Sequence, residues 1–155
     1  MNYDIVIIGG GPAGLSFACS MADLDLNILL VEKSALKSIS KPKPDGREIA
    51  LTHHSRKILI KLGVWTLIDK AQVSPLKEAK VFDGGSDSLL NFDAKKSAIE
   101  ALGYLVPNHL IRAALFERVS EADNVTILNE LIVDGVNTTN TGAEVSLSNG
   151  KTIKS

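Results

Sequence analysis

The sequence contains one cysteine and no excess of charge of either sign. Cys19 has no second cysteine with which to form an intrachain disulfide, and no cysteine–histidine spacing offers four ligands to a structural metal. Lysine and arginine number 17 against 18 aspartate and glutamate residues, so the chain lacks the basic surplus that neutralises a nucleic-acid backbone. We therefore expect a protein of a reducing, cytoplasmic compartment that does not bind nucleic acid.

Long apolar runs are also missing. The uninterrupted apolar stretches are far shorter than the roughly 18 residues of a membrane span, and no lysine or arginine precedes the first of them. This pattern predicts neither a transmembrane helix nor a signal peptide. Hydrophobic residues make up 45% and charged residues 23% of the 155, which is ordinary for one globular domain.

The first thirty residues have the pattern of a strand, a helix and a second strand. Residues 3–8 are a β-branched run without alternation, which is typical of a parallel strand buried on both faces. Pro12 favours the first turn of a helix, which we expect to continue to about residue 25. Residues 27–32 repeat the buried-strand pattern, so residues 3–32 predict one right-handed crossover unit.

The middle of the chain mixes loops with short elements. Residues 34–46 are polar, contain two prolines and lack a period, which predicts a long surface loop. Residues 52–62 predict a helix that Gly63 caps, and residues 65–68 begin a further short element. Two short strands around Gly84 and Gly85 predict a hairpin over residues 77–92.

The last third begins with a strong helical pattern. Residues 102–106 predict a short strand, and Asn108 is suited to cap the helix that follows. Short strands are then expected at 125–128, 131–136, 143–147 and 151–153. We interpret these four as a β-meander. Because the chain stops at Ser155 directly after the last strand, we expect a domain that is incomplete at its C-terminus.

A glycine motif lies between the first strand and the first helix. Gly9 allows a tight turn, Gly11 lets a pyrophosphate approach the backbone, and Gly14 lets helix and strand pack closely. Glu32 ends the second strand, where a carboxylate can accept the hydroxyl protons of an adenosine ribose. Pro12 and Ala13 complete the loop. Glycine-rich turns also occur for conformational reasons alone, but the flanking strand, helix and acid favour a dinucleotide site. These residues do not separate FAD from NAD.

Other reactive side chains are expected to be structural. Cys19 lies within the first helix and is interpreted as a buried small hydrophobe. His53 and His54 are adjacent and cannot face one metal ion together on a helix. Trp65 and Tyr104 are expected in the core rather than as stacking platforms for bases.

Three segments carry a resemblance to a known family. Residues 3–15 (YDIVIIGGGPAGL) resemble the FAD-binding start of the para-hydroxybenzoate hydroxylase-like flavoproteins. Residues 45–55 (DGREIALTHHS), continuing to LGVW at 62–65, and residues 102–115 (LGYLVPNHLIRAAL) resemble the ubiquinone-biosynthesis hydroxylases, above all the 5-demethoxyubiquinol 5-hydroxylase branch. The resemblance covers essentially the whole chain.

The resemblance implies a cofactor and further site residues. It implies FAD at the glycine motif, with Arg47 and Arg112 beside the cofactor. Lys33, next to the ribose acid, is counted with the cofactor-binding segment, although we expect it to be solvated. Residue pattern and resemblance together predict an α/β fold, namely a three-layer, Rossmann-like FAD-binding domain with a β-meander. This domain spans residues 1–155 and includes the start of a substrate-domain hairpin at about 77–92.

The resemblance also implies an activity for the complete enzyme. It implies an FAD-dependent monooxygenase, reduced by NAD(P)H, that hydroxylates a quinol ring of a ubiquinone precursor. No side chain is expected to act as an acid–base catalyst. Association with the inner membrane or with a ubiquinone-biosynthesis complex stays open. So do two alternatives: another flavoprotein of the same fold, such as a reductase or halogenase, and a non-catalytic nucleotide-binding remnant.

Two family motifs find no counterpart in the chain. The family has an Asp-Gly segment after the meander and a Gly-Asp motif much later, both at the cofactor. Asp134 and Gly135 are interpreted as a turn or bulge instead. We therefore expect the 155-residue chain to be inactive alone.

Overall fold

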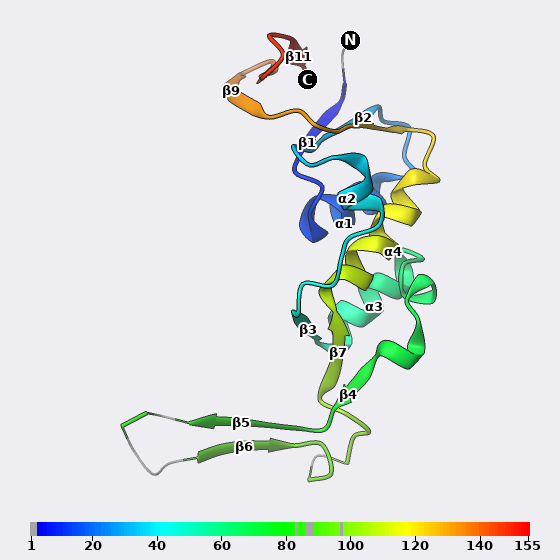
Figure 1. Ribbon diagram of the computed structural model, residues 1–155, viewed down its shortest axis with the longest axis vertical. Helices are drawn as coiled ribbons and strands as arrows, with labels where there is room; N and C mark the ends of the chain where they lie inside the picture. The colour runs from blue at the N-terminus through cyan, green and yellow to red at the C-terminus, as the bar shows by residue number, and fades with distance from the viewer. Residues whose placement is uncertain (1–2, 83, 86–88, 97) are drawn as a thin grey trace. The chain divides into compact units, whose positions relative to one another are not determined.

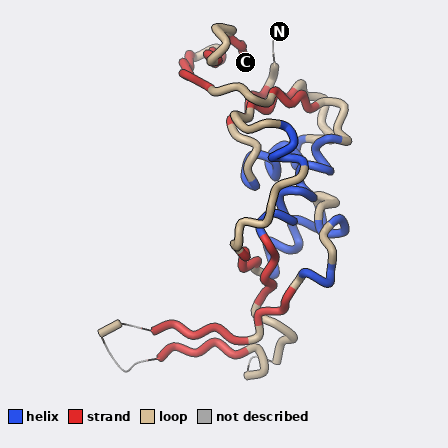
Figure 2. Tube along the Cα trace, in the orientation of Figure 1, coloured by secondary structure: helices blue, strands red, loops and turns tan. Residues whose placement is uncertain are grey.

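The computed structural model describes residues 3–82, 84–85, 89–96 and 98–155. The chain divides into two compact units. Unit 1 comprises Met1–Lys43 and Ile111–Ser155, and unit 2 comprises Pro44–Leu110. Each unit combines helices with strands, as Figures 1 and 2 show along the chain.

A parallel sheet forms the centre of unit 1. Its strands are β1 (Ile5–Ile8), β2 (Ile28–Val31) and β8 (Val125–Leu128), in the order β1-β2-β8. All four residues of β2 are buried, as the apolar run predicts. In β1 only Ile7 is buried and Ile8 is 53% exposed, so burial of this strand on both faces is a wrong prediction. The physical reason is its place at the edge of the sheet, where, among the described residues, it pairs with β2 alone.

An antiparallel meander forms a second sheet in unit 1. It consists of β9 (Val133–Thr139), β10 (Gly142–Leu147) and β11 (Thr152–Lys154), in the order β11-β10-β9. Leu29 and Val31 of the parallel sheet share a buried cluster with meander residues, which are Val145, Leu147 and Ile153. The predicted meander is confirmed for these three strands. The fourth strand assigned to it, residues 125–128, instead pairs in parallel with β2.

The meander contains a bulge where the sequence has Asp134 and Gly135. Ser146 pairs with Gly135, whereas the next residue, Leu147, pairs with Val133. Asp134 is therefore the extra residue on β9, which confirms the bulge interpretation.

Helices cover the other face of the parallel sheet. The helix α1 (Pro12–Met21) contacts both β1 and β2, and the Cys19 thiol donates to the Leu115 carbonyl of α4 (Asn108–Ser120) at 3.6 Å. Side chains alternate along a strand, so Ile28 and Leu30 point away from the meander, and both are fully buried. Unit 1 thus has three layers, as predicted: helices, parallel sheet and meander.

Two sequence-based expectations are wrong in unit 1: the end of the first helix and the absence of a helix from the loop that follows the second strand. The helix α1 ends at Met21 rather than near residue 25, and the Asn124 side chain donates to the carbonyls of Met21, Leu24 and Leu26 at 3.0 Å each. These carbonyls therefore have a partner without a further helical turn. The segment 34–46 contains a short helix, α2 (Leu36–Ser40), whose one buried residue is Ile39.

An antiparallel sheet organises unit 2. Its strands are β3 (Glu48–Leu51), β7 (Gly103–Pro107) and β4 (Ser74–Leu76), in the order β3-β7-β4. The sequence predicts only β7. Exposed residues dominate β3 and β4, so neither strand has a clear apolar pattern. Pairing with β7 decides their conformation.

The helix α3 (His53–Lys61) has a well-defined cap at each end. The Thr52 hydroxyl accepts the Ser55 amide at 3.1 Å at the N-terminus. At the C-terminus Gly63 has φ +74°, and the amides of Gly63 and Val64 donate to the carbonyls of Ile60 and Leu59. This is the Schellman arrangement, so the predicted glycine cap is confirmed. Two 3₁₀ turns follow, η1 (Trp65–Leu67) and η2 (Lys70–Gln72).

The predicted hairpin is confirmed as β5 (Glu78–Phe82) and β6 (Leu89–Asp93), which pair antiparallel. Its connecting residues lie partly outside the described ones. Several of its apolar side chains are exposed, namely Val81, Phe82, Leu89, Leu90 and Phe92. In the described parts of the chain, no helix has the length and apolar character needed to cross a membrane.

Candidate nucleotide-binding site

The three glycines of the motif differ in what they do in the fold. Gly9 has φ +102°, a conformation that side-chain-bearing residues rarely adopt. A Cβ on Gly14 would overlap the Gly9 carbonyl oxygen, whereas a Cβ on Gly11 would meet nothing within 4 Å. The turn therefore requires glycine at position 9, and the close packing of helix and strand requires it at position 14. The space beside Gly11 is open to a ligand.

The N-terminus of α1 follows this loop. Gly11 is its N-cap, with φ −79° and ψ 179°, and no side chain accepts from the first amides. Pro12 occupies the first turn, which contains no acidic residue, and Pro12 and Ala13 are exposed. Within the described part of the chain, no protein anion contacts the first amides or the positive end of the helix dipole, as an anion site requires.

Glu32 connects the end of β2 to the glycine loop. The Gly10 amide donates to its Oε2 at 2.6 Å, and the Ser34 amide donates to its Oε1 at 2.8 Å. The residue is only 8% exposed. Burial by itself raises the pKa of Glu32, but the hydrogen bonds from Ser34 and Gly10 outweigh it and leave the pKa lowered. Glu32 is therefore an ionised carboxylate, fixed against the loop, with acceptor capacity left on both oxygens.

A mostly apolar pocket of about 210 Å³ adjoins Glu32. Its lining consists of Ile8, Gly9, Val31, Glu32, Lys33, Leu131, Ile132 and Val133. The Leu131 amide donates to the Glu32 carbonyl at 3.1 Å, which holds the segment after β8 beside the acid. Sequence reasoning assigned residues 131–133 to the meander and missed this position. Their apolar character was visible, but their place beside Glu32 depends on β8 joining the parallel sheet.

The structure thus brings the glycine loop and Glu32 together in unit 1. Lys33 is exposed and lines the same pocket. Arg112 also belongs to unit 1, half-buried on α4, and it forms no ion pair within the described part of the chain.

Arg47 belongs to unit 2, in the loop before β3. Its guanidinium forms an ion pair with Asp45 at 2.6 Å, and its side chain is 67% exposed. A pocket of about 410 Å³ lies beside it, lined by Pro44, Gly46, Arg47, Glu48, Pro107 and His109. Asn108, predicted to cap α4, instead donates its side-chain amide to Asp45 at 2.8 Å.

The residues expected to be structural have well-defined surroundings. Burial raises the pKa of the Cys19 thiol to about 11, so Cys19 is a buried neutral thiol, as predicted. Trp65 is buried, and the Arg56 guanidinium lies over the rings of Trp65 and Tyr104 at 5.2 and 4.7 Å. No group of three or more potential metal ligands occurs among the residues that the structure describes.

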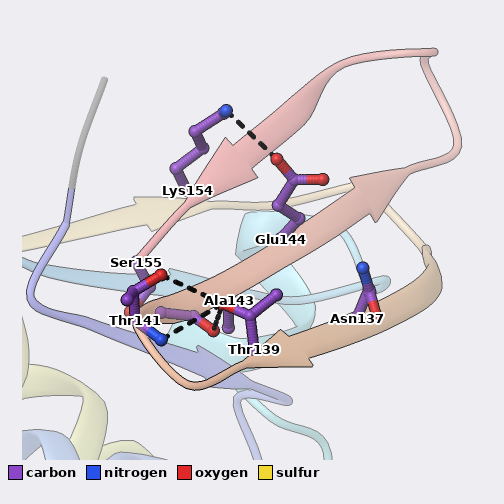
Figure 3. A pocket seen from close by; sticks show the side chains of 8 residues that line it. Asn137, Thr139, Thr141, Ala143, Glu144, Lys154 and Ser155 are labelled. Atoms are coloured by element: carbon purple, nitrogen blue, oxygen red, sulfur yellow. Dashed lines mark hydrogen bonds and ion pairs between the residues drawn. The ribbon is translucent and has the colours of Figure 1, made fainter.

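A further hollow lies on the meander and is shown in Figure 3. It is lined by residues of β9, β10 and β11 and their connections, and an ion pair between Lys154 and Glu144 at 3.1 Å crosses it. Both side chains are about half exposed or more, so this is a solvated cross-strand pair on the sheet surface.

Comparison with known proteins shows which flavoproteins the chain is similar to. The family model described as "FAD binding domain" matches residues 4–41, which include the glycine loop, Glu32 and α2. The chain is 46% identical over 155 residues to the ubiquinone hydroxylase UbiM of Neisseria meningitidis, covering 97% of this chain and 34% of that protein. By sequence, the chain is similar to the N-terminal part of the FAD-dependent ubiquinone-biosynthesis hydroxylases.

Two more distant members of this hydroxylase family agree. The ubiquinone hydroxylase UbiL of Rhodospirillum rubrum is 27% identical over 151 residues, covering 97% of this chain and 35% of its own length. The mitochondrial ubiquinone biosynthesis monooxygenase COQ6 of Xenopus tropicalis is 33% identical over 133 residues, covering 81% and 28%. The chain spans about a third of the length of these relatives.

Solved structures show the same fold. The flavin-dependent monooxygenase PieE, in complex with FAD and substrate, matches with a TM-score of 0.74 at 19% identity, covering 100% of this chain and 29% of that one. The anhydrotetracycline hydroxylase OxyS of Streptomyces rimosus matches with a TM-score of 0.75 at 20% identity, covering 99% and 30%. The predicted α/β FAD-binding fold is confirmed.

Proposed function

We propose that unit 1 binds the ADP half of FAD and that the protein hydroxylates the ring of a ubiquinone precursor. The observation that carries this proposal is the pair of hydrogen bonds that fixes the ionised Glu32 between the glycine loop and the end of β2. Similarity to the ubiquinone hydroxylases supports the choice of FAD and of substrate.

The residues of unit 1 fit the parts of an ADP group. The open space at Gly11 and the uncapped first turn of α1 suit the two negative phosphates. The Glu32 carboxylate suits the ribose hydroxyls. We assign the adenine ring to the apolar pocket lined by residues 131–133, with Lys33 at its rim.

Two arginines are proposed as further contacts to the cofactor. Arg47 presents an exposed guanidinium suited to a phosphate oxygen, and Arg112 carries a charge that no acid in the described part of unit 1 neutralises. Neither is proposed to act as an acid or base; both serve as hydrogen-bond donors.

When bound, FAD would supply the chemistry: with two electrons from NAD(P)H, one oxygen atom of O₂ would enter the substrate ring and the other would leave as water. The protein's own residues bind and orient the cofactor. The substrate is proposed to be a quinol of ubiquinone biosynthesis, a demethoxyubiquinol by the sequence resemblance. For such a lipid-soluble substrate we propose a cytoplasmic location, peripheral at the inner membrane.

The test has two parts. FAD is titrated into the purified cofactor-free protein and into its Gly11→Val variant, with flavin fluorescence as the signal. We expect saturable binding by the first and at least a hundredfold weaker binding by the second, because a branched side chain fills the space beside the loop. The protein, extended to the length of its relatives, is then incubated with NAD(P)H and a short-chain demethoxyquinol. Absence of a product heavier by one oxygen atom would contradict the proposed activity.

A further inference from the structure

The carboxylate of Asp45 collects four hydrogen bonds in unit 2. Its Oδ1 accepts the Arg47 amide at 3.1 Å. Its Oδ2 accepts Arg47 Nε at 3.0 Å, Arg47 Nη2 at 2.6 Å and Asn108 Nδ2 at 2.8 Å. Asp45 therefore holds both the backbone and one edge of the guanidinium of the same arginine.

A buried residue fixes this arrangement to the rest of unit 2. Asn108 is 4% exposed. Its side chain donates to Asp45, and its backbone N–H donates to the Arg47 carbonyl at 2.9 Å. Gly46, with φ +71°, turns the chain between the two charged residues. Hydrogen bonds from Arg47 and Asn108 hold the pKa of Asp45 well below its usual range, so the carboxylate is charged at any physiological pH.

The other edge of the guanidinium stays available. Asp45 occupies Nε and one position of Nη2, and Nη1 has no hydrogen-bond partner among the described residues. Arg47 is 67% exposed and lines the pocket of about 410 Å³ together with His109 and Pro107. An arginine fixed along one edge can still offer the remaining N–H groups to a phosphate in the planar geometry that such groups prefer.

We propose that Asp45 is a positioning residue, which holds the Arg47 guanidinium ready for a phosphate of the cofactor. The proposal rests on the function proposed above, in which Arg47 contacts FAD. A free arginine side chain samples many rotamers and loses that freedom when it binds an anion. Asp45 and Asn108 restrict the side chain during folding, so less freedom is lost on binding.

The carboxylate has an opposing effect that the experiment must separate. Its negative charge weakens the attraction of Arg47 for a phosphate. At an exposed site this repulsion is small and is screened by salt, whereas the short hydrogen bonds of Asp45 to Arg47 and Asn108, which order the side chain, depend less on salt. Loss of the carboxylate is therefore expected to weaken cofactor binding, and by a larger factor at high salt than at low salt.

The experiment is a double-mutant cycle on FAD binding. Dissociation constants are measured by flavin fluorescence for the wild type, Asp45→Asn, Arg47→Gln and the double variant, at low and high salt. We expect Asp45→Asn to bind about tenfold more weakly, since the freed arginine must be ordered on binding. The double variant should bind like Arg47→Gln alone, because Asp45 acts through Arg47.

Asp69→Asn is the matched control. Asp69 accepts the Ala71 amide at 3.0 Å, the same backbone bond that Asp45 makes to Arg47, but it holds no arginine side chain. Its substitution should leave FAD affinity unchanged. Asn108→Ala gives a second test, because it keeps the ion pair and removes its anchor. A loss of affinity that disappears in the Arg47→Gln background is expected here too.

The possible failures differ from one another. Wild-type affinity in Asp45→Asn, or an equal loss in the presence and absence of Arg47, overturns the positioning role and leaves Arg47 as a cofactor contact. Wild-type affinity in Arg47→Gln removes Arg47 from the proposed cofactor site and overturns the positioning role with it. Both results leave the assignment of Glu32 and the glycine loop to FAD unaffected.

Discussion

Two buried acidic or weakly acidic side chains in unit 1 illustrate how surroundings decide charge. Glu32 and Cys19 are both almost inaccessible, and burial disfavours the charged form of each. Two backbone amides point at the Glu32 carboxylate, whereas the Cys19 thiol only donates weakly to a carbonyl. Glu32 is therefore ionised, while Cys19 is neutral and inert.

Glu32→Gln is expected to weaken FAD binding by about ten- to a hundredfold, matching charged hydrogen bonds worth about 1.5–3 kcal/mol. The amide keeps the shape of the side chain but carries no charge. Its NH₂ group also faces either the Gly10 or the Ser34 amide, where two donors oppose each other. Isothermal titration of FAD into the cofactor-free variant measures the change.

Asp4→Asn is the control for this substitution. Asp4 accepts the Asn27 amide at 2.7 Å at the opposite end of the β1–β2 pair, so it joins the same two strands without facing the glycine loop. An equal loss of affinity in both variants would mean that Glu32 acts through the stability of the sheet.

The lowered pKa of Glu32 also predicts a pH dependence of stability. A carboxyl whose pKa is lower in the folded state stabilises the fold above its ordinary pKa of about 4.5. This contribution is lost as the pH falls through the lower folded value. The free energy of unfolding of wild type should therefore fall more steeply below pH 4.5 than that of Glu32→Gln, as chemical denaturation at several pH values can measure. Parallel curves would contradict the lowered pKa.

The raised pKa of Cys19 predicts that stability falls as the pH rises, the opposite of the effect of Glu32. Its pKa is raised from 9.0 to about 11, so the thiol stabilises the fold fully below pH 9 and loses this contribution between pH 9 and 11. Wild type should lose on the order of 2 kcal/mol more than Cys19→Ala across this range. The comparison cancels other groups that titrate there. Rapid modification of the folded wild type by a thiol reagent at pH 8 would also contradict the burial of this side chain.

At the scale of elements, the sequence predicts best where a residue's local conformation decides the structure. Gly63 caps α3 because its φ of +74° suits glycine, and Gly9 turns the chain at φ +102° for the same reason. The alternation and apolar runs of β2 and β10 suffice to place those strands. Glu32 could be selected from the sequence because, in a crossover unit, the second strand ends at a nearly fixed distance after the glycine motif.

Features that depend on pairing with distant segments could not be predicted. The strand β8 has the same local pattern as the meander strands, and only its pairing with β2 assigns it to the parallel sheet. The strands β3 and β4 are mostly exposed and exist through their hydrogen bonds to β7. For this reason the pocket wall at residues 131–133 and the link from Asp45 to Asn108 were invisible in the sequence. Each joins segments that lie far apart along the chain.

Two alanine substitutions at the junction of β1 and α1 distinguish a glycine needed for packing from one that leaves space for a ligand. Gly14→Ala is expected to destabilise the fold by about 2–3 kcal/mol, because the added methyl group overlaps the Gly9 carbonyl. Gly11→Ala meets nothing within 4 Å and keeps an extended backbone, so it should leave the melting temperature unchanged. Thermal unfolding of both cofactor-free variants measures the difference. Equal melting temperatures would show that helix and strand can separate enough to admit the methyl group.

At the scale of the whole molecule, low net charge coincides with an exposed apolar surface. The formal net charge is −1 at pH 7, which gives little electrostatic repulsion between copies. Within the hairpin, Val81 and Leu90 pair directly across the two strands and are 55% and 58% exposed. Phe92 and Ala79 form the next pair on the same face. Side chains of this kind favour association between molecules.

We expect the purified 155-residue chain to self-associate through this hairpin face at high concentration. The variant Val81→Lys/Leu90→Glu places opposite charges at one cross-strand pair, which keeps the strands together while removing the apolar contact. Its sedimentation coefficient should stay constant over a concentration range in which that of the wild type rises. Because apolar association does not depend on charge attraction, added salt should not dissociate the wild type. A control with the same two charges, Leu24→Lys/Ile58→Glu, alters exposed apolar residues that are not part of the hairpin and should associate like the wild type. Monomeric behaviour of this control would mean that charge on any surface suffices, and that the hairpin face is not the contact.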